Sequence, residues 1–339
     1  MKSLKKDYFN PFFSHIYVEK SVRNSAYTQK ILAKFPSAKI IEIDHYKDVF
    51  CRSRQNYPLQ HCSQKLILAA KKGTMLYKGA PVCQSFGSEY FYYTSCAMNC
   101  IYNCVYCYLK GMYPSANIVV FVNLEEIFAE VEQRLQMHPL YLCISYDTDL
   151  LALESITGYV QEWCTFAAKY KNLKIEIRTK CANSSFAFRM HPIPQVIYAF
   201  TLSPQPIIEA FEHNTPSLTK RLSCAAELTQ SGYPVRLCFD PMLYVPDWKQ
   251  HYSEMLKLVF QSIEMGKIMD VSIGTFRISQ DYLKNIRKQT PESAVIWFPF
   301  QKENGYCHYP EDLMEQMENF LAKKLEEEIS RENIFRWKA

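Results

Sequence analysis

The stretch CAMNCIYNCVYCYLK, residues 96–110, carries four cysteines within twelve positions. Cys100, Cys104 and Cys107 follow the spacing C-x3-C-x2-C, whereas Cys96 stands outside that frame. A structural zinc site, a set of buried thiols and an iron–sulfur cluster are the alternatives for such a segment. A cage of three thiolates suits a cluster that keeps one iron open for a non-protein ligand, so the spacing favours the cluster.

The bulk composition is that of a globular chain. Its 339 residues include 39 basic and 34 acidic side chains, and the resulting net charge of +5 permits contact with a polyanion without requiring it. The first twenty residues have no apolar stretch of signal-peptide length, and no run approaches the ~18 apolar residues of a membrane span. We therefore expect a cytoplasmic protein without a membrane partner, in which closely spaced cysteines are ligands or catalysts rather than disulfides.

Short apolar runs alternate with amphipathic segments along most of the chain. The runs that predict strands are residues 39–43, 66–70, 89–94, 117–122, 140–145, 173–179, 196–202, 234–239 and 269–276. Strands that alternate with helices indicate a parallel sheet with right-handed crossovers. Six or seven units between about residues 88 and 280 predict a partial (βα)6-type TIM barrel, whose chemistry lies where strands end.

The two ends of the chain predict smaller additions to the barrel. We expect an N-terminal α/β cap over residues 1–87, the partial barrel over 88–290, and a C-terminal hairpin and helix over 291–339. The hairpin is predicted from strand-like residues 294–300 and 306–309 around a turn at Asn304-Gly305, and the charged helix from 310–333.

Capping patterns mark two of the barrel helices. Asn123, with Glu126 three residues later, predicts an N-cap and a capping box. Thr215 and Pro216 predict the start of another helix, and Gly232 predicts its end.

The cysteine frame follows the strand-like residues 89–94, and C-x3-C-x2-C is the signature of radical S-adenosylmethionine enzymes. Within that group the chain resembles the spore photoproduct lyase family. The resemblance spans roughly residues 60–310 and includes a cysteine loop, a strand and helix after it, a C-x-S segment and three later blocks, in the family's order. These are NCVYCYL (103–109), IVVFVNLEEIFAEV (118–131), LCISYDTDLLALE (142–154), IRTK (177–180), FTLSPQPIIEAFEHNTPSLTKRL (200–222) and GYPVRLCFDPML (232–243).

The resemblance implies a DNA-repair reaction. A [4Fe-4S] cluster on Cys100, Cys104 and Cys107 would cleave S-adenosyl-L-methionine to a 5′-deoxyadenosyl radical, which removes the C6 hydrogen of 5-thyminyl-5,6-dihydrothymine so that the dimer splits. The partners implied are damaged DNA that contains this thymine dimer and an electron donor such as flavodoxin or ferredoxin. The setting implied is sporulation and spore germination.

The family's radical-transfer residues have matches in this chain. Cys143 matches the cysteine that returns hydrogen to the product thymine, and its place near the end of a predicted strand suits that role. Tyr106 and Tyr108 flank the last cluster cysteine and match the tyrosines that pass the radical back. The plain alternatives are a core cysteine and packing aromatics.

Cofactor-binding residues are expected at the ends of three successive strands. By the resemblance these are Ser145, Lys180, which would meet the methionine carboxylate, and Thr201, with Ser203 on the same face. Thr201 replaces the family's serine but keeps a hydroxyl. A solvated lysine at a strand end is the alternative for Lys180.

The family also holds DNA open with a basic C-terminal hairpin, because a lesion must leave the base stack before a buried radical can reach it. Here the hairpin region, residues 298–310, carries a single lysine, Lys302, so phosphate contacts are instead expected from Arg277, Arg287 and Lys288. Two other functions stay open from the sequence. One is a related radical enzyme with another substrate, and the other is a zinc-bound nucleic-acid adaptor.

Overall fold

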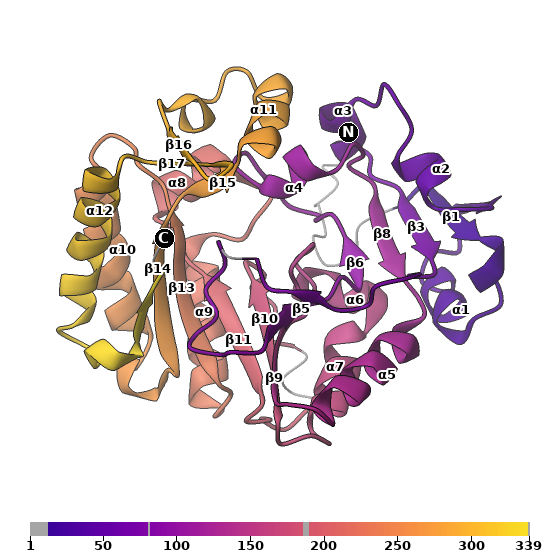
Figure 1. Cartoon of the computed structure of the whole chain (residues 1–339), viewed down its shortest axis with the longest axis horizontal. Helices are drawn as coiled ribbons and strands as arrows, with labels where there is room; N and C mark the ends of the chain where they lie inside the picture. The colour runs from indigo at the N-terminus through magenta and orange to yellow at the C-terminus, as the bar shows by residue number, and fades with distance from the viewer. Residues whose placement is uncertain (1–12, 81, 186–189, 338–339) are drawn as a thin grey trace.

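A curled sheet of eight strands forms the centre of the computed structural model, which describes residues 13–80, 82–185 and 190–337 (Figure 1). In spatial order the strands are β18 (Ile334–Arg336), β14 (Asp270–Thr275), β13 (Val235–Met242), β11 (Val196–Thr201), β10 (Leu173–Thr179), β9 (Leu140–Cys143), β5 (Phe91–Tyr93) and β4 (Tyr77–Lys78). From β5 to β14 every neighbouring pair is parallel. These six strands confirm the predicted partial (βα)6 barrel.

Amphipathic helices cover the outer face of the barrel. They are α5 (Leu124–Leu135), α7 (Tyr159–Ala167), α8 (Gln205–Phe211), α9 (Leu218–Gln230), α10 (Trp248–Ser262) and α12 (Glu311–Leu325). In α5 the buried residues Leu124, Ile127, Val131 and Leu135 recur every three or four positions, which gives one apolar face toward the sheet.

A second sheet of five strands lies beside the barrel (Figure 1). Its order is β2 (Lys39–Ile43), β1 (His15–Glu19), β3 (Leu66–Ala69), β8 (Ile118–Phe121) and β6 (Ala97–Met98). The run at 117–122, which the sequence counts among the barrel units, therefore pairs with β3 of this sheet. Sheet membership depends on long-range pairing, which the local pattern of apolar residues does not encode.

The C-terminal region differs from its prediction in two places. Ala294–Trp297 is a 3-10 helix rather than a strand, and the hairpin consists of β16 (Gln301–Glu303) and β17 (Tyr306–His308). The turn is confirmed, because Asn304 and Gly305 both have positive φ, as a two-residue hairpin requires. The charged helix ends at Leu325, and the chain then adds β18 to the barrel beside β14.

The two predicted helix starts are each modified by tertiary contacts. Asn123 precedes α5 but its side chain bonds the backbone of Lys71, accepting from its N–H at 2.7 Å, and makes no cap bond. The cap of α9 is Ser217, two residues after Thr215. Gly232 lies just past that helix with φ of 80°, in agreement with the prediction.

Shorter elements connect these layers. They are η1 (Lys20–Val22), α1 (Ala26–Leu32), α2 (Lys47–Phe50), α3 (Tyr57–His61), β7 (Asn103–Cys104), α4 (Tyr108–Met112), η2 (Leu151–Leu153), α6 (Glu154–Thr157), β12 (Glu212–His213), η4 (Met265–Lys267), β15 (Arg277–Ser279), α11 (Gln280–Gln289) and η6 (Arg331–Asn333). Within the described residues, no helix has both the length and the apolar character needed to span a bilayer.

Candidate functional site

The cysteine loop begins at the carboxyl end of β5, the first parallel strand of the barrel. Cys104 lies in β7 and pairs with Glu212 of β12, and Cys107 directly precedes α4. The backbone N–H of Tyr102 donates to Cys100 Sγ at 3.4 Å. Cys104 is buried, while Cys100 and Cys107 are half-buried. The three thiols of the C-x3-C-x2-C frame therefore share one short, anchored loop.

The same three thiols lie close enough to influence one another. Burial raises the pKa of Cys100, and the nearby Asp149 carboxylate and Cys107 thiol raise it further. Burial also raises the pKa of Cys104 to about 12, against the lowering effect of the Lys180 ammonium. Three soft sulfur donors with a cation nearby fit an iron–sulfur cluster, whose iron deprotonates its thiols. Among the described residues no three His, Cys, Asp or Glu side chains converge as a single metal ion requires.

Cys96 belongs to the protein core. Its side chain is 1% exposed, and Trp163 of α7 donates an indole N–H to its sulfur at 3.2 Å. Cys96 is therefore packed in the core against α7. That it takes no part in the metal site stays a prediction from the spacing.

A buried carboxylate, Glu212, organises the space beside Cys104. Tyr106 donates its hydroxyl to Glu212 Oε1, and Ser203 donates to the same oxygen at 2.8 Å. Arg221 Nη2 pairs with Oε2 at 2.5 Å, and both charged side chains are fully buried. Burial alone would raise the pKa of Glu212, but Arg221 and Lys180 lower it to about 2. Ser203 and Tyr106 are therefore held by this carboxylate.

Of the other predicted cofactor residues, Lys180 and Thr201 interact with this cluster of charges. Burial lowers the pKa of Lys180, but Glu212 and the Cys104 thiol outweigh burial and raise it overall. Its ammonium lies 5.7 Å from the ring centre of Tyr106. The Ser145 Oγ is buried with no hydrogen-bond partner among the described residues, which leaves it available to a bound molecule. Thr201 is buried, and its carbonyl accepts from Arg221.

Cys143 is the last residue of β9 and is buried. It stands opposite Tyr93 of β5 and Glu176 of β10. Burial raises the pKa of its thiol, the Glu176 carboxylate adds to this, and Arg178 opposes it. A thiol in these surroundings keeps its proton, so Cys143 offers an S–H bond rather than a thiolate.

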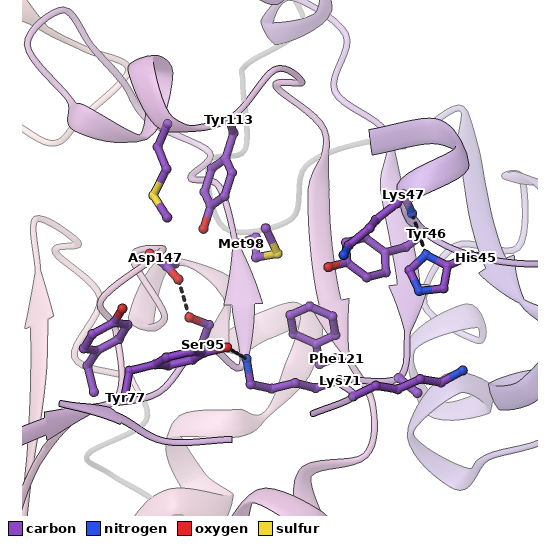
Figure 2. Close-up of a pocket in the computed structure, with 14 residues that line it drawn as sticks. His45, Tyr46, Lys47, Lys71, Tyr77, Ser95, Met98, Tyr113, Phe121 and Asp147 are labelled. Atoms are coloured by element: carbon purple, nitrogen blue, oxygen red, sulfur yellow. Dashed lines mark hydrogen bonds between the residues drawn. The ribbon is translucent and has the colours of Figure 1, made fainter. Parts of the chain in front are cut away.

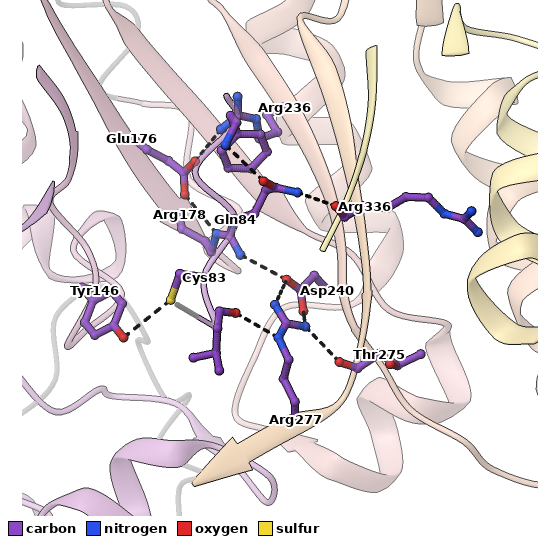
Figure 3. Close-up of polar contacts among 12 residues, drawn as sticks. Cys83, Gln84, Tyr146, Glu176, Arg178, Arg236, Asp240, Thr275, Arg277 and Arg336 are labelled. Atoms are coloured by element: carbon purple, nitrogen blue, oxygen red, sulfur yellow. Dashed lines mark hydrogen bonds and ion pairs between the residues drawn. The ribbon is translucent and has the colours of Figure 1, made fainter. Parts of the chain in front are cut away.

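Tyr146, a residue that the sequence did not single out, contacts Tyr108. Tyr108 donates its hydroxyl to the carbonyl of Tyr146, and the two rings lie 5.9 Å apart. The Tyr146 hydroxyl lies 3.6 Å from Cys83 Sγ, as Figure 3 shows, and Cys83 raises the pKa of Cys143 further. Tyr146 also stacks on Tyr93 at 4.0 Å.

Charged side chains of β10 and β13 contact one another (Figure 3). Glu176 accepts from Arg178 at 3.1 Å and from Arg236 at 2.5 Å. Phe86 lies against the Arg236 guanidinium at 3.2 Å. The segment 82–86 thus enters the barrel and covers its polar interior.

The predicted phosphate contacts separate into two groups. Arg277 pairs with Asp240 at 3.2 Å and is 10% exposed, so the structure contradicts its expected role on the surface. Arg287 and Lys288 instead belong to a surface depression of about 570 Å³ that also contains Lys284, Lys302 and the half-exposed Trp297. The guanidinium of Arg287 lies 4.7 Å from the Trp297 ring centre.

Sequence reasoning missed Glu212, Arg221, Tyr146 and Cys83. Glu212 and Arg221 sit in ordinary amphipathic contexts, and only the fold shows that both are buried. Tyr146 lies directly after Ser145 in the SYDTD segment, and no local pattern distinguishes it.

Comparison with known proteins places these features in one family. The family model "Spore photoproduct lyase" matches residues 15–335. The spore photoproduct lyase of Clostridium acetobutylicum is 23% identical over 240 residues, covering 67% of this chain and 70% of that protein. The Bacillus subtilis enzyme is 21% identical over 297 residues, covering 84% and 85%.

Solved structures share the fold. A spore photoproduct lyase complexed with dinucleoside spore photoproduct superposes with a TM-score of 0.82 at 16% identity, covering 97% of this chain and 99% of that one. A mutant with bound AdoMet and the same dinucleoside reaches a TM-score of 0.81 at 16% identity, with 96% and 98% covered. The match of the family model over nearly the whole chain shows that this protein belongs to the spore photoproduct lyase family.

Proposed function

We propose that this protein is a radical S-adenosylmethionine lyase that converts the spore photoproduct, 5-thyminyl-5,6-dihydrothymine, in DNA back to two thymines. One observation carries the proposal. Cys143 of β9 pairs in register with Tyr93 of β5, three residues before the cysteine loop starts, so a protonated thiol lies on the strand next to the one that leads into that loop. Family membership and the solved complex of a relative with the dinucleoside lesion support the same function.

Cofactor binding is assigned to residues around the loop. Cys100, Cys104 and Cys107 hold the [4Fe-4S] cluster, and Lys180 attracts the carboxylate of S-adenosylmethionine. The unpartnered hydroxyl of Ser145 and that of Thr201 complete the cofactor pocket. When bound, the cluster and S-adenosylmethionine together supply a 5′-deoxyadenosyl radical that removes the C6 hydrogen of the lesion. The protein's own residues bind and orient S-adenosylmethionine and the lesion, and they then quench the product thymine radical.

Cys143 supplies the hydrogen atom that completes the repair. After the bond between the two thymines breaks, the product thymine radical takes hydrogen from the Cys143 S–H, and a thiyl radical remains. Burial raises the pKa of this thiol, which keeps the S–H bond intact until it is needed. The thiyl radical regains hydrogen from a phenol, and Tyr108 and Tyr106 pass the radical back toward the cofactor. Glu212 orients the phenol of Tyr106 through their hydrogen bond.

DNA contacts are assigned to the depression on α11. Lys284, Arg287, Lys288 and Lys302 supply positive charge for phosphates, and the half-exposed Trp297 offers a surface on which a base can stack. The lesion leaves the duplex to reach Cys143, since the thiol is buried.

The setting and the electron source belong to the same proposal. We infer a cytoplasmic protein that is reduced by a carrier such as flavodoxin or ferredoxin. All thirteen cysteines are free, which agrees with a reducing compartment.

A direct test uses the purified protein and the synthetic dinucleotide photoproduct. Anaerobic protein with S-adenosylmethionine and a reductant should release thymine, as followed by chromatography, and the Cys104→Ala variant should release none. If the wild-type protein carries the cluster and cleaves S-adenosylmethionine but leaves the photoproduct intact, the substrate is a different one.

A further inference from the structure

A cavity of about 360 Å³ lies between the five-stranded sheet and the barrel, and none of the residues assigned above to the cluster, to S-adenosylmethionine or to radical transfer lines it (Figure 2). Its wall combines a buried acid, Asp147, with a buried base, Lys71. Such a cavity, with a few polar groups among aromatic side chains, is the usual form of a small-molecule site.

Asp147 contributes a buried carboxylate to the wall of this cavity. The side chain is 5% exposed, and Ser95 donates its hydroxyl to Oδ2. Oδ1 is buried and accepts no hydrogen bond of ordinary geometry among the described residues, although the Tyr113 hydroxyl lies on the same wall. Burial raises the pKa of Asp147, whereas hydrogen bonding from the Ser95 and Tyr113 hydroxyls lowers it. A buried carboxylate oxygen without a well-aligned partner is costly, so a ligand N–H that adds to the Tyr113 contact would stabilise this wall.

Lys71 presents the complementary donor. It is 6% exposed, and its ammonium lies 5.0 Å from the ring centre of Tyr77 and 5.3 Å from that of Phe121. Among the described residues no carboxylate lies within ion-pair distance of it, and its one polar contact is to the Tyr77 hydroxyl at 3.5 Å. The amide of Asn123 bonds both backbone groups of Lys71, which fixes the residue in place. A ligand carbonyl or phosphate would give this cation a partner.

The rest of the wall selects among ligands with both a donor and an acceptor. Tyr46 packs edge-on against Phe121 at 5.6 Å, and Tyr77 stacks on Tyr93 at 5.1 Å, so the cavity has flat aromatic faces. Three further basic side chains, His45, Lys47 and Lys72, stand at the same cavity. A neutral amino acid would satisfy Asp147 and Lys71 but leave the ammonium groups of Lys47 and Lys72 without a counter-charge. A pyrimidine base with its phosphate satisfies all four side chains.

We propose that this cavity binds one nucleotide unit, with the imide N–H of a pyrimidine on Asp147, a ring carbonyl on Lys71 and the phosphate near Lys47 and Lys72. Two sources share this chemistry: a nucleotide of the DNA strand outside the reacting dimer, or a free nucleotide. The strand source rests on the proposed function, whereas binding to the cavity itself does not.

The test is a calorimetric titration of the full-length protein with thymidine 5′-monophosphate. Asp147→Asn should weaken binding about tenfold, because a donor then faces the imide N–H. Lys72→Ala should weaken it about threefold, since Lys72 is exposed and screened. The matched control is Lys78→Ala, an exposed lysine of β4 outside the cavity, which should leave the affinity unchanged.

Competition then separates the two sources. An undamaged thymine oligonucleotide that displaces the mononucleotide from wild-type protein, and binds Asp147→Asn more weakly, identifies the DNA strand; failure to displace it identifies a free nucleotide. The proposal is overturned if the wild-type protein binds no thymidine 5′-monophosphate at millimolar concentration, or if both variants bind as tightly as wild type. Should Asp147→Asn misfold, Lys72→Ala alone decides.

Repair of the dinucleotide photoproduct separates this proposal from the proposed function. That substrate has no flanking nucleotide, so Asp147→Asn should repair it at the wild-type rate. If Asp147→Asn loses mononucleotide binding but still repairs the dinucleotide, the result supports the cavity proposal and does not bear on the proposed function.

Discussion

Tyr106 donates its hydroxyl to a carboxylate oxygen of Glu212, which is also paired with Arg221 at 2.5 Å. Glu212 in turn stands in register with Cys104 across β12 and β7. The tyrosine between two of the expected cluster ligands is thus fixed by a charged network that comes from a segment a hundred residues later. A carboxylate with a pKa of about 2 stays ionised and holds the phenol by a charge-assisted bond.

The first prediction concerns the cluster cage. Cys100→Ala, Cys104→Ala and Cys107→Ala should each lose the ~4 irons per chain expected of the cluster, because three thiolates hold it. Cys96→Ala should keep its iron, since that sulfur contacts Trp163 instead. Iron analysis and visible absorption of anaerobically purified protein provide the measurement. Loss of iron from Cys96→Ala would show that the frame is assigned wrongly.

The second prediction concerns Lys180. Lys180→Ala should weaken binding of S-adenosylmethionine by roughly 1–3 kcal/mol, the cost of leaving a buried polar group without its partner, and leave the iron content unchanged. Lys174 is a matched control, because it lies on β10, the strand that directly precedes Lys180, but is exposed. Equilibrium dialysis with both variants provides the comparison. Equal affinities of the two variants for S-adenosylmethionine would show that Lys180 is a solvated side chain that does not bind the cofactor.

The third prediction separates radical formation from quenching. Cys143→Ala should still bind the cluster, cleave S-adenosylmethionine and attack the lesion, because Cys143 lies on a barrel strand outside the cluster loop. Without its S–H bond the product radical would be trapped by external reductant, so adducts should replace thymine. Mass spectrometry of the products distinguishes these outcomes. A normal yield of thymine would make Cys143 a core residue, and loss of cofactor cleavage would place it in the cofactor site.

The fourth prediction concerns the buried pair. Glu212→Gln should destabilise the protein by roughly 3–5 kcal/mol, because it leaves the Arg221 charge buried without its partner. Glu209→Gln changes an exposed glutamate on α8 and should cost little. Urea unfolding of the two variants gives the difference. Equal midpoints would mean that Arg221 finds another partner.

The fifth prediction concerns the depression on α11. Replacing Lys284 and Lys288 by alanine should weaken binding of undamaged duplex and reduce the slope of log K against log salt by about 1.8, near 0.9 for each lost phosphate contact. The matched control replaces Lys171 and Lys174, which are exposed elsewhere on the barrel. Fluorescence anisotropy at several salt concentrations measures both slopes. An unchanged slope in the first variant would place the DNA on another face.

Much of the barrel was predictable because its strands are buried on both faces. Runs such as Val196–Thr201 are apolar at almost every position. Their alternation with helices is enough by itself to predict parallel strands. The exceptions depend on distant partners. Residues 117–122 form a strand as predicted, but β3 draws that strand into the second sheet. Residues 294–300 have a strand-like composition, but Ala294–Trp297 form a 3-10 helix instead.

The sequence by itself determined the cysteine frame, the family and the positions of Cys143 and Lys180 at strand ends, because covalent spacing and strand order are properties of the chain. Only the tertiary structure decided that Cys96 faces Trp163, that Glu212 holds Tyr106 and Ser203, and that Asp147 and Lys71 share a cavity. These relationships join segments that are far apart in the sequence. Their side chains become buried only when the sheets close around them. Burial makes an unpaired charge costly, so the charges that remain are those with a partner.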